Sequence, residues 1–419
     1  MHPANATKAV TPVVASVILL EVAIAVALAT VAWINGLSTS LMDVEELYAT
    51  NHQWGPNGTY VDVTLQNTGT QSVKLSSVTA NSQPTTVVYI TGSSQISPGE
   101  SAVVRISSTF VLGTSYQFTF QSVKGTRFFY IATAEQVSSV FRMEWGTVTA
   151  DDTFKTVTLQ QTYSSPIIVC TPAYSSGVPR TVRLTDVLPN SFKVKVQNPS
   201  NTTVLETTVN YLVVEEGEWT EPFKIEAKKY QTSTVGQNND WNYDLRSYGQ
   251  TYAGNLIVLH QVMSNNDPTW ITTYISKSNS RTNPPSSANS NFRIALNGAE
   301  AVDTHEAETV GYIIIQEGQD LLDGIQWDSK QTADSIQGFL NSPPYNTSFD
   351  QTFAEPPAVT LAFQQEMDGS DGGWAIVYST SSTHLGLACD EDQVKDTDRS
   401  HTTEICGFIV FENAGSYTQ

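Results

Sequence analysis

Apolar and polar residues follow two patterns along the chain, and the first is an almost continuous apolar stretch from residue 13 to residue 37. Glu21 is its only charged residue. A helix needs about 20 apolar residues to cross the hydrocarbon core of a bilayer, so the stretch predicts a long hydrophobic helix. A secretory signal would have a shorter apolar region, so we expect this helix to be retained and to cover residues 10–48.

The second pattern begins near residue 51 and consists of short runs in which apolar and polar residues alternate. Turn residues such as Asn67–Gly69 and Pro98–Gly99 separate these runs. Such alternation between turn signals is typical of antiparallel sandwiches. The expected fold class is therefore mainly β. We predict a long N-terminal hydrophobic α-helix, an Ig-like β-sandwich over residues 49–137, and tandem antiparallel β-sandwich modules behind it.

The tandem modules are predicted from an internal repeat in the second half of the chain. Four residues recur with identical spacing, followed by a shared histidine: Gln261, Met263, Asp267, Trp270 and His305 match Gln365, Met367, Asp371, Trp374 and His401. A more distant copy without this motif or the histidine precedes them. Self-similarity at a fixed period marks repeated structural units. We expect three modules, over residues 138–218, 219–320 and 321–419.

Charges on either side of the apolar stretch predict its orientation. Lys8 precedes the stretch, whereas Asp43, Glu45 and Glu46 follow it. Positive residues favour the cytoplasmic side of a membrane. We therefore expect a cytoplasmic N-terminus, one membrane-spanning helix, and an extracellular chain behind it.

Lys8, Ala9 and Val10, followed by Thr-Pro and the apolar stretch, resemble the class III signal of archaeal type IV pilins and archaellins. The resemblance implies cleavage between Ala9 and Val10, so that residues 1–9 form a leader peptide and the helix remains in the mature subunit. It also implies a homopolymeric filament whose core is built from these helices, with the membrane as the partner before assembly. The NTG and PGE turns and the GTSY strand of residues 49–137 are similar to the head domain of archaeal pilins.

Glu21 has two interpretations in this setting, because a carboxylate inside an apolar helix is costly unless it is protonated, paired or in contact with protein. In the filament that the resemblance implies, it would set the helix register by meeting the N-terminal amine of a neighbouring subunit. Alternatively, it lies close enough to a helix end to reach water.

The strands of residues 138–218 resemble those of H-type lectins, in which six strands form a small sandwich that binds carbohydrate. The resemblance implies a carbohydrate or cell-surface ligand. Candidate ligand-binding residues are the repeated polar and aromatic positions, namely Gln261, Asp267, Trp270, His305, Gln365, Asp371, Trp374 and His401. The alternative is structural. Each histidine would then cap the last strand through a hydrogen bond to a carboxylate, and each tryptophan would lie in a core.

Acidic residues outnumber basic residues by 41 to 21, which gives a formal charge of −20. Nucleic acid is therefore excluded as an expected partner, because the chain offers few cations to replace the counterions of a phosphate backbone. An acidic surface suits high salt, low pH or divalent cations, and it is also an ordinary means of staying soluble.

The acidic residues include one dense loop in the last module. Asp390, Glu391 and Asp392 are the candidate metal ligands, because clustered oxygen atoms suit Ca²⁺. The alternative is a solvated acidic loop. We expect no other cofactor.

Two further features concern covalent chemistry. Cys389 and Cys406 border one polar loop between two strand-like runs, so a disulfide across a hairpin is expected between them, which leaves Cys170 over. Asn57, Asn201 and Asn346 begin NxS/T sequons near turns on the predicted outer side and are candidate glycosylation sites.

No enzyme is expected, because the sequence contains no GxSxG elbow, no Gly-rich phosphate loop and no HExxH metal helix. The leading hypothesis is an extracellular type IV pilin-like filament subunit with surface-exposed adhesive β domains. The alternative is a single-pass, membrane-anchored surface receptor or lectin that does not polymerise.

Overall fold

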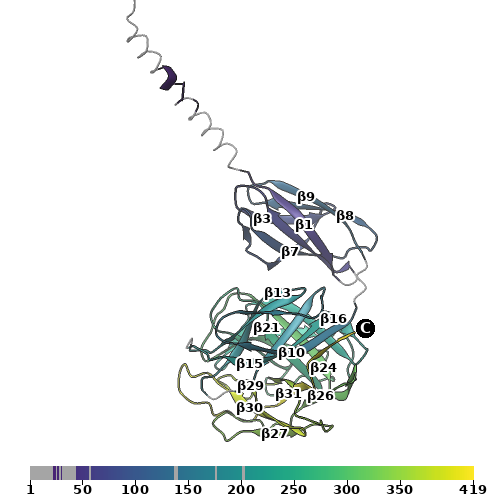
Figure 1. Cartoon of the computed structure of the whole chain (residues 1–419), viewed down its shortest axis with the longest axis vertical. Helices are drawn as coiled ribbons and strands as arrows, with labels where there is room; N and C mark the ends of the chain where they lie inside the picture. The colour runs from purple at the N-terminus through teal and green to yellow at the C-terminus, as the bar shows by residue number, and fades with distance from the viewer. Residues whose placement is uncertain are drawn as a thin grey trace, which may run out of the picture. The chain divides into compact units, whose positions relative to one another are not determined.

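β-strands dominate the computed structural model (Figure 1). It describes residues 22–24, 26–27, 30, 44–55, 58–135, 140–174, 177–200 and 203–419. The chain forms two compact units, Met1–Val137 and Ser138–Gln419. The expectation of a mainly β chain is confirmed to this extent.

The predicted N-terminal helix over residues 10–48 is wrong. Residues 44–46 are not helical, and strand β1 (Leu47–Trp54) begins before the predicted end of the helix. Leu47 pairs with Asn67 and its side chain joins the core of the first unit, so a strand ladder satisfies the backbone at this point. α-Helix is limited to residues 22–24, 26–27 and 30 within the part of the chain that the structure describes.

The predicted transmembrane helix is corrected together with it. No helix among the described residues is long and apolar enough to span a bilayer. The residues given to processing and helix register, Lys8, Ala9, Val10 and Glu21, lie outside the described residues.

The first unit contains two antiparallel sheets. One has the strand order β1-β2-β7-β5, and the other has the order β4-β3-β8-β9, with β6 also paired to β3. The remaining strands are β2 (Tyr60–Asn67), β3 (Val73–Ala80), β4 (Gln83–Pro84), β5 (Thr86–Thr91), β6 (Gln95–Ile96), β7 (Ser101–Ser107), β8 (Ser115–Ser122) and β9 (Arg127–Thr133). Alternate residues of β2, such as Val61 and Val63, are buried, which accounts for the period-two pattern.

The second unit contains three modules, each with two sheets. Module 1 comprises β10 (Arg142–Ala150), β11 (Lys155–Thr158), β12 (Pro166–Pro172), β13 (Thr181–Leu188), β14 (Ser191–Gln197) and β15 (Thr207–Glu215). Module 2 comprises β17 (Ile225–Thr232), β18 (Val235–Gln237), β19 (Asp240–Trp241), β20 (Asp244–Ser247), β21 (Leu256–Val262), β22 (Thr272–Lys277), β23 (Asn291–Ala299) and β24 (Glu308–Gln316). Module 3 comprises β26 (Ile325–Gln331), β27 (Tyr345–Ser348), β28 (Val359–Gln364), β29 (Trp374–Thr380), β30 (His384–Asp390) and β31 (Cys406–Phe411).

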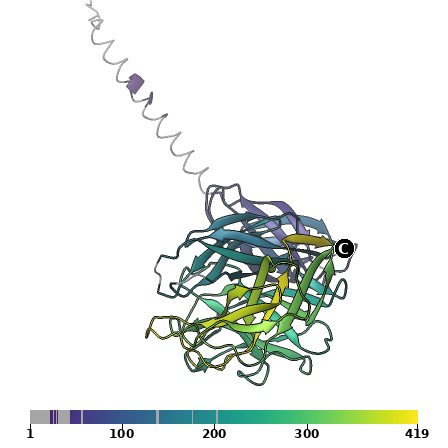
Figure 2. The ribbon, with the colours of Figure 1, turned by 60° about the horizontal axis from the view of Figure 1, so that its bottom comes forward.

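Three short edge strands link the modules into a closed ring. β16 (Gly217–Trp219) follows module 1 and pairs with β17 of module 2, and β25 (Gly318–Leu322) follows module 2 and pairs with β26 of module 3. β32 (Gly415–Thr418) follows module 3 and pairs with β10 of module 1. Figure 2 shows this C-terminal strand among strands from the start of the unit. Each module therefore receives an edge strand from the preceding one.

The inner sheets of the three modules have the orders β12-β15-β10-β32, β21-β24-β17-β16 and β28-β31-β26-β25. One face of each inner sheet packs in its own module, and the other joins a core shared by the three modules. The shared core contains Ile167, Val169, Ile257, Leu259, Leu361 and Phe363. Burial of both faces explains why these strands are continuous apolar runs without alternation.

A second repeat, not identified in the sequence analysis, anchors the inner sheets. Gln161, Gln250 and Gln351 each begin a tripeptide, QTY, QTY and QTF. Their side-chain amides donate to the carbonyl oxygens of Met143 at 3.3 Å, Ile225 at 3.0 Å and Trp327 at 2.6 Å, respectively. The next residues, Glu144, Glu226 and Asp328, accept backbone N–H groups from Gln160, Gly249 and Asp350. The three modules thus share one buried polar anchor.

Candidate functional site

The glutamines of the motif repeated in modules 2 and 3, Gln261 and Gln365, lie at contacts between modules. Gln261 donates to the carbonyl oxygen of Val182 at 2.8 Å, and Gln365 exchanges two hydrogen bonds of 2.9 Å with the backbone of Val258. Both side chains are buried. In this structure they hold neighbouring modules together, and the surrounding chain satisfies their polar groups.

The repeated tryptophans are also buried, with ring centroids 5.4 Å apart. Trp270 donates its indole N–H to the hydroxyl of Thr181 at 2.8 Å. The indole Nε1 of Trp374 is buried and has no hydrogen-bond partner within the described chain. The two copies of the repeat therefore differ at this atom.

The histidines of the repeat occupy polar loops next to the last strands of modules 2 and 3. The ring nitrogens of His305 face the carbonyl oxygens of Glu306 at 2.9 Å and Thr269 at 3.2 Å. Asp267 accepts the Thr269 N–H at 2.8 Å, and hydrogen bonds from the Thr269 hydroxyl and amide lower the pKa of this carboxyl.

His401 lies between two carboxylates in module 3. Its Nδ1 is hydrogen-bonded to Glu391, and its Nε2 is 2.8 Å from Glu404 Oε1. Burial alone would lower the pKa of His401, but the hydrogen bonds to Glu391 and Glu404 raise it to about 10. The ring is therefore an imidazolium at neutral pH, with both nitrogens used as donors. Asp371, Glu391 and His401 each place one ligand atom within 4.8 Å of the others, so a metal ion bound there would have to displace the proton of the ring.

The three carboxylates predicted to bind calcium are held by different partners. Asp390 pairs with the Arg399 guanidinium at 2.7 and 3.0 Å, and Glu391 pairs with His401. Asp392 accepts the backbone N–H groups of Glu300 at 2.8 Å and Val394 at 2.9 Å. The loop is a set of separate ion pairs and caps.

A different acidic group brings three carboxylates together. Ligand oxygens of Asp334, Glu366 and Asp368 lie within 4.8 Å of one another. An oxygen-only set of this kind is the type that Ca²⁺ or Mg²⁺ prefers. Burial, reinforced by the neighbouring Asp368 and Glu404, raises the pKa of Glu366 to about 8. Sequence reasoning missed this group because Asp334 lies far from the other two along the chain.

The raised pKa of Glu366 predicts a pH-dependent stability. The folded state binds the proton of the Glu366 carboxyl more tightly than the unfolded state, in which the pKa is the ordinary 4.5. Proton binding therefore contributes its full stabilisation below pH 4.5, and this contribution is lost as pH rises through about 8. Because loop relaxation and water entry reduce the cost of burying a charge, we expect the free energy of unfolding to fall by about 1–2 kcal/mol across this pH window without divalent cations.

Urea unfolding of wild type and Glu366→Gln at several pH values measures this fall in stability. Wild type should change more steeply than the variant, whereas Glu306→Gln, at an exposed residue, should match wild type. Equal slopes for wild type and Glu366→Gln would contradict the assignment.

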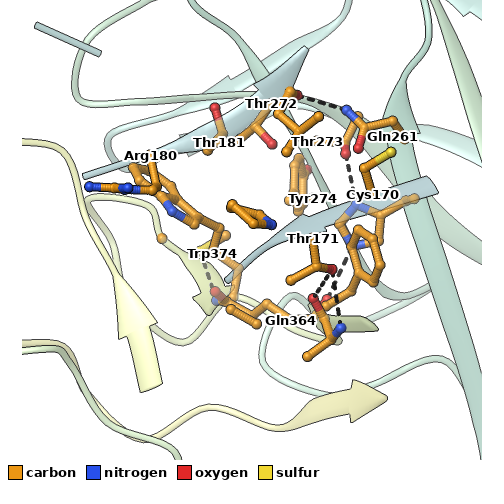
Figure 3. Close-up of a pocket in the computed structure, with 18 residues that line it drawn as sticks. Cys170, Thr171, Arg180, Thr181, Gln261, Thr272, Thr273, Tyr274, Gln364 and Trp374 are labelled. Atoms are coloured by element: carbon orange, nitrogen blue, oxygen red, sulfur yellow. Dashed lines mark hydrogen bonds between the residues drawn. The ribbon is translucent and has the colours of Figure 1, made fainter. Parts of the chain in front are cut away.

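A small pocket lies where the ends of β12, β21 and β28 meet (Figure 3). The space open to water is about 40 Å³, enough for two or three water molecules. His260 lines the pocket, with Nδ1 2.7 Å from the Thr273 hydroxyl and Nε2 3.2 Å from the Gln364 carbonyl oxygen. Burial lowers the pKa of His260 to about 4, so it is neutral at pH 7.

A larger, open pocket lies where module 2 passes its edge strand to module 3. It has a volume of about 460 Å³ and is lined by Phe223, Lys224, Ala253, Gln316, Glu317, Gly318, Gln319, Asp320 and Trp327. The Phe223 and Trp327 ring centroids are 4.4 Å apart. Trp327 Nε1 is buried and without a hydrogen-bond partner among the described residues. Sequence reasoning missed this pocket, because none of its residues belongs to the repeated motif.

The predicted disulfide and glycosylation sites differ in where the structure places them. Cys170, Cys389 and Cys406 are free, buried thiols. Strands β30 and β31 belong to different sheets of module 3, so Cys389 and Cys406 face each other across the core of the module and not across a hairpin. Asn346 is exposed on β27, whereas Asn57 and Asn201 lie outside the described residues.

No family model matches the chain. A stretch of 279 residues, which covers 63% of this chain, is 23% identical to Halomucin of Haloquadratum walsbyi. The chain spans only 3% of the length of that curated relative. Neither a pilin family nor a lectin family is shown by these comparisons. The distant match to an archaeal cell-surface protein and the β-rich modules fit an extracellular surface protein.

Proposed function

We propose that this chain is an adhesive surface protein whose module ring binds carbohydrate in the open pocket beside Trp327. The observation that carries the proposal is the combination of a partly exposed Phe223 ring, packed on Trp327, and several polar side chains in one open pocket. Its volume of about 460 Å³ lies within the range of about 300–1,000 Å³ that is common for ligand pockets.

The pocket chemistry suits a sugar because a pyranose ring has apolar C–H faces and polar hydroxyl groups. Phe223 is partly exposed and supplies aromatic surface for the C–H face, and the buried Trp327 ring packs behind it. Gln319 and Asp320 are exposed at the rim, where an amide and a carboxylate can accept hydroxyl hydrogen bonds. Lys224 also lines the pocket, and its ammonium group donates to the Thr251 carbonyl oxygen and has further N–H donors for a ligand. Binding of this kind requires no catalytic group.

Position within the ring also supports binding at this pocket. Residues 316–320 comprise the end of β24, the connecting Glu317 and the start of the edge strand β25, and Trp327 lies on β26, to which β25 is paired. Because the connection is fixed at both ends by sheet pairing, it presents its polar groups with little freedom. A rigid site loses less conformational entropy when a ligand binds.

Binding of the full chain to a glycan array, followed by titration of the best glycan, tests the proposal. The double variant Gln319→Ala/Asp320→Ala should weaken binding at least tenfold, which corresponds to about 1.4 kcal/mol, because two hydrogen-bonding groups are removed from the rim. Asp303→Ala removes an exposed carboxylate outside the pocket and should bind as wild type does. If no glycan is retained, or if the double variant binds as tightly as wild type, the proposal fails.

A further inference from the structure

We propose that Arg180 and Trp374 form a binding site for a small monovalent anion such as chloride, at the contact between modules 1 and 3. Both side chains line the small pocket where the three inner sheets meet. Figure 3 shows them on one side of this pocket, with Cys170 and Gln261 on the other. The site is distinct from the open pocket beside Trp327.

The first argument is an unpaired donor on each of the two side chains. Arg180 is 5% exposed and Trp374 is 7% exposed. Arg180 Nη1 and Trp374 Nε1 are both buried and have no hydrogen-bond partner within the described residues. Among the described residues, the Arg180 side chain makes one hydrogen bond to the protein, from Nε to the Val178 carbonyl oxygen at 3.4 Å. Both residues line one cavity, and each of these buried N–H donors calls for an acceptor, because a buried donor without a hydrogen bond costs about 1–3 kcal/mol.

The second argument is the charge around Arg180. Arg399 lies nearby and forms a bidentate pair with Asp390, at 2.7 and 3.0 Å, and also donates to the Gly177 carbonyl oxygen. A second, narrow space beside the small pocket is lined by Arg180, Asp390 and Arg399. Two guanidinium groups thus share one carboxylate, and the group has a net charge of +1. Burial lowers the pKa of Arg180, with Asp390 opposing the change, as expected for a cation without its own counter-charge.

The third argument comes from the repeat. Trp270 matches Trp374 in the preceding module, but its indole N–H donates to Thr181, the residue next to Arg180. Trp374 has no such acceptor in the described chain. Module 1 supplies a hydroxyl acceptor to Trp270, and beside Trp374 the proposed anion would accept the indole hydrogen bond.

Size and charge select the ligand. The space open to water, about 40 Å³, admits a monatomic anion together with a water molecule and is too small for a sugar ring. A water molecule could accept both N–H bonds, but it would leave the positive charge uncompensated. A buried charge is strongly destabilising unless it is paired. A halide ion satisfies both donors and the charge.

Thermal unfolding of the full chain in sodium chloride and in sodium gluconate, at matched ionic strength, measures the effect. Chloride should raise Tm in a saturable manner, since a ligand that binds only the folded state stabilises it by mass action. Trp374→Phe and Arg180→Met should lose most of this chloride-dependent increment. Trp270→Phe is the matched control, because its N–H already has a protein partner. It should lower Tm equally in both salts and keep the increment.

Crystals soaked in sodium bromide provide a second measurement that does not depend on the stability of variants. We expect an anomalous peak between Arg180 Nη1 and Trp374 Nε1. An unoccupied or water-filled site would show no peak, and the increment in Tm would be the same for Trp374→Phe as for wild type. Either result would overturn the proposal.

Discussion

Replacement of Arg183 by Met is expected to lower the unfolding free energy of the second unit by about 3–5 kcal/mol, which is the usual cost of removing one partner from a buried ion pair. Arg183 and Glu308 are fully buried, and Arg183 Nη2 lies 2.5 Å from Glu308 Oε1. The same guanidinium donates to the carbonyl oxygens of Ser264, Thr269 and Asp267, at 2.6, 3.3 and 2.9 Å. The variant would leave one buried carboxylate without its cation and three carbonyl groups without their donor.

Urea unfolding followed by tryptophan fluorescence measures this loss. Lys193→Met is the matched control, because Lys193 also forms an ion pair, with Asp186 at 2.8 Å, but both side chains are about half exposed. Exposed pairs contribute about 0–1 kcal/mol, so the control should remain close to wild type. If both variants lost similar stability, the contact between modules 1 and 2 would not depend on the buried pair.

Deletion of residues 414–419 is expected to open the ring and to destabilise module 1 by about 2–4 kcal/mol. The deletion removes β32, whose four residues pair with Arg142–Trp145 of β10. Each such backbone hydrogen bond contributes about 0.5–1.5 kcal/mol. It also removes the carbonyl of Tyr417, which accepts the Gln161 side-chain amide at 3.2 Å.

Loss of β32 also turns β10 into a free edge, and free edges pair with other chains. We therefore expect a lower urea midpoint together with dimers or larger species in size-exclusion chromatography. Deletion of Gln419 alone keeps β32 intact and serves as the control. A monomeric truncated chain with an unchanged midpoint would mean that ring closure contributes little to stability.

Much of the local structure could be predicted from the sequence. Alternation in residues 60–67 and 101–107 predicted strands with one buried face, and the structure has β2 and β7 there. Patterning failed near residue 47, where the helix was extended too far. The acidic and apolar residues of that segment suit a helix as well as a strand, and pairing with β2 decides in favour of the strand.

The candidate sites were less accessible to sequence reasoning. Repeated spacing singled out Gln261, Trp270 and His401, and all three are buried in contacts that join loops or modules. A repeat identifies residues that the fold reuses, and reuse is as characteristic of packing as of binding. The open pocket beside Trp327 contains no repeated motif residue, because only one junction between modules carries its particular side chains.

The β character of the chain, the positions of many strands and the recurrence of one motif could be predicted from the sequence, because alternation and spacing are local properties of the chain. Tertiary packing was needed to show that the modules are linked by edge strands in a closed ring, that Arg183 meets Glu308, and that Arg180 and Trp374 line one cavity. These contacts join residues that are distant along the chain. Their formation depends on how apolar faces pack between modules, which no local pattern records.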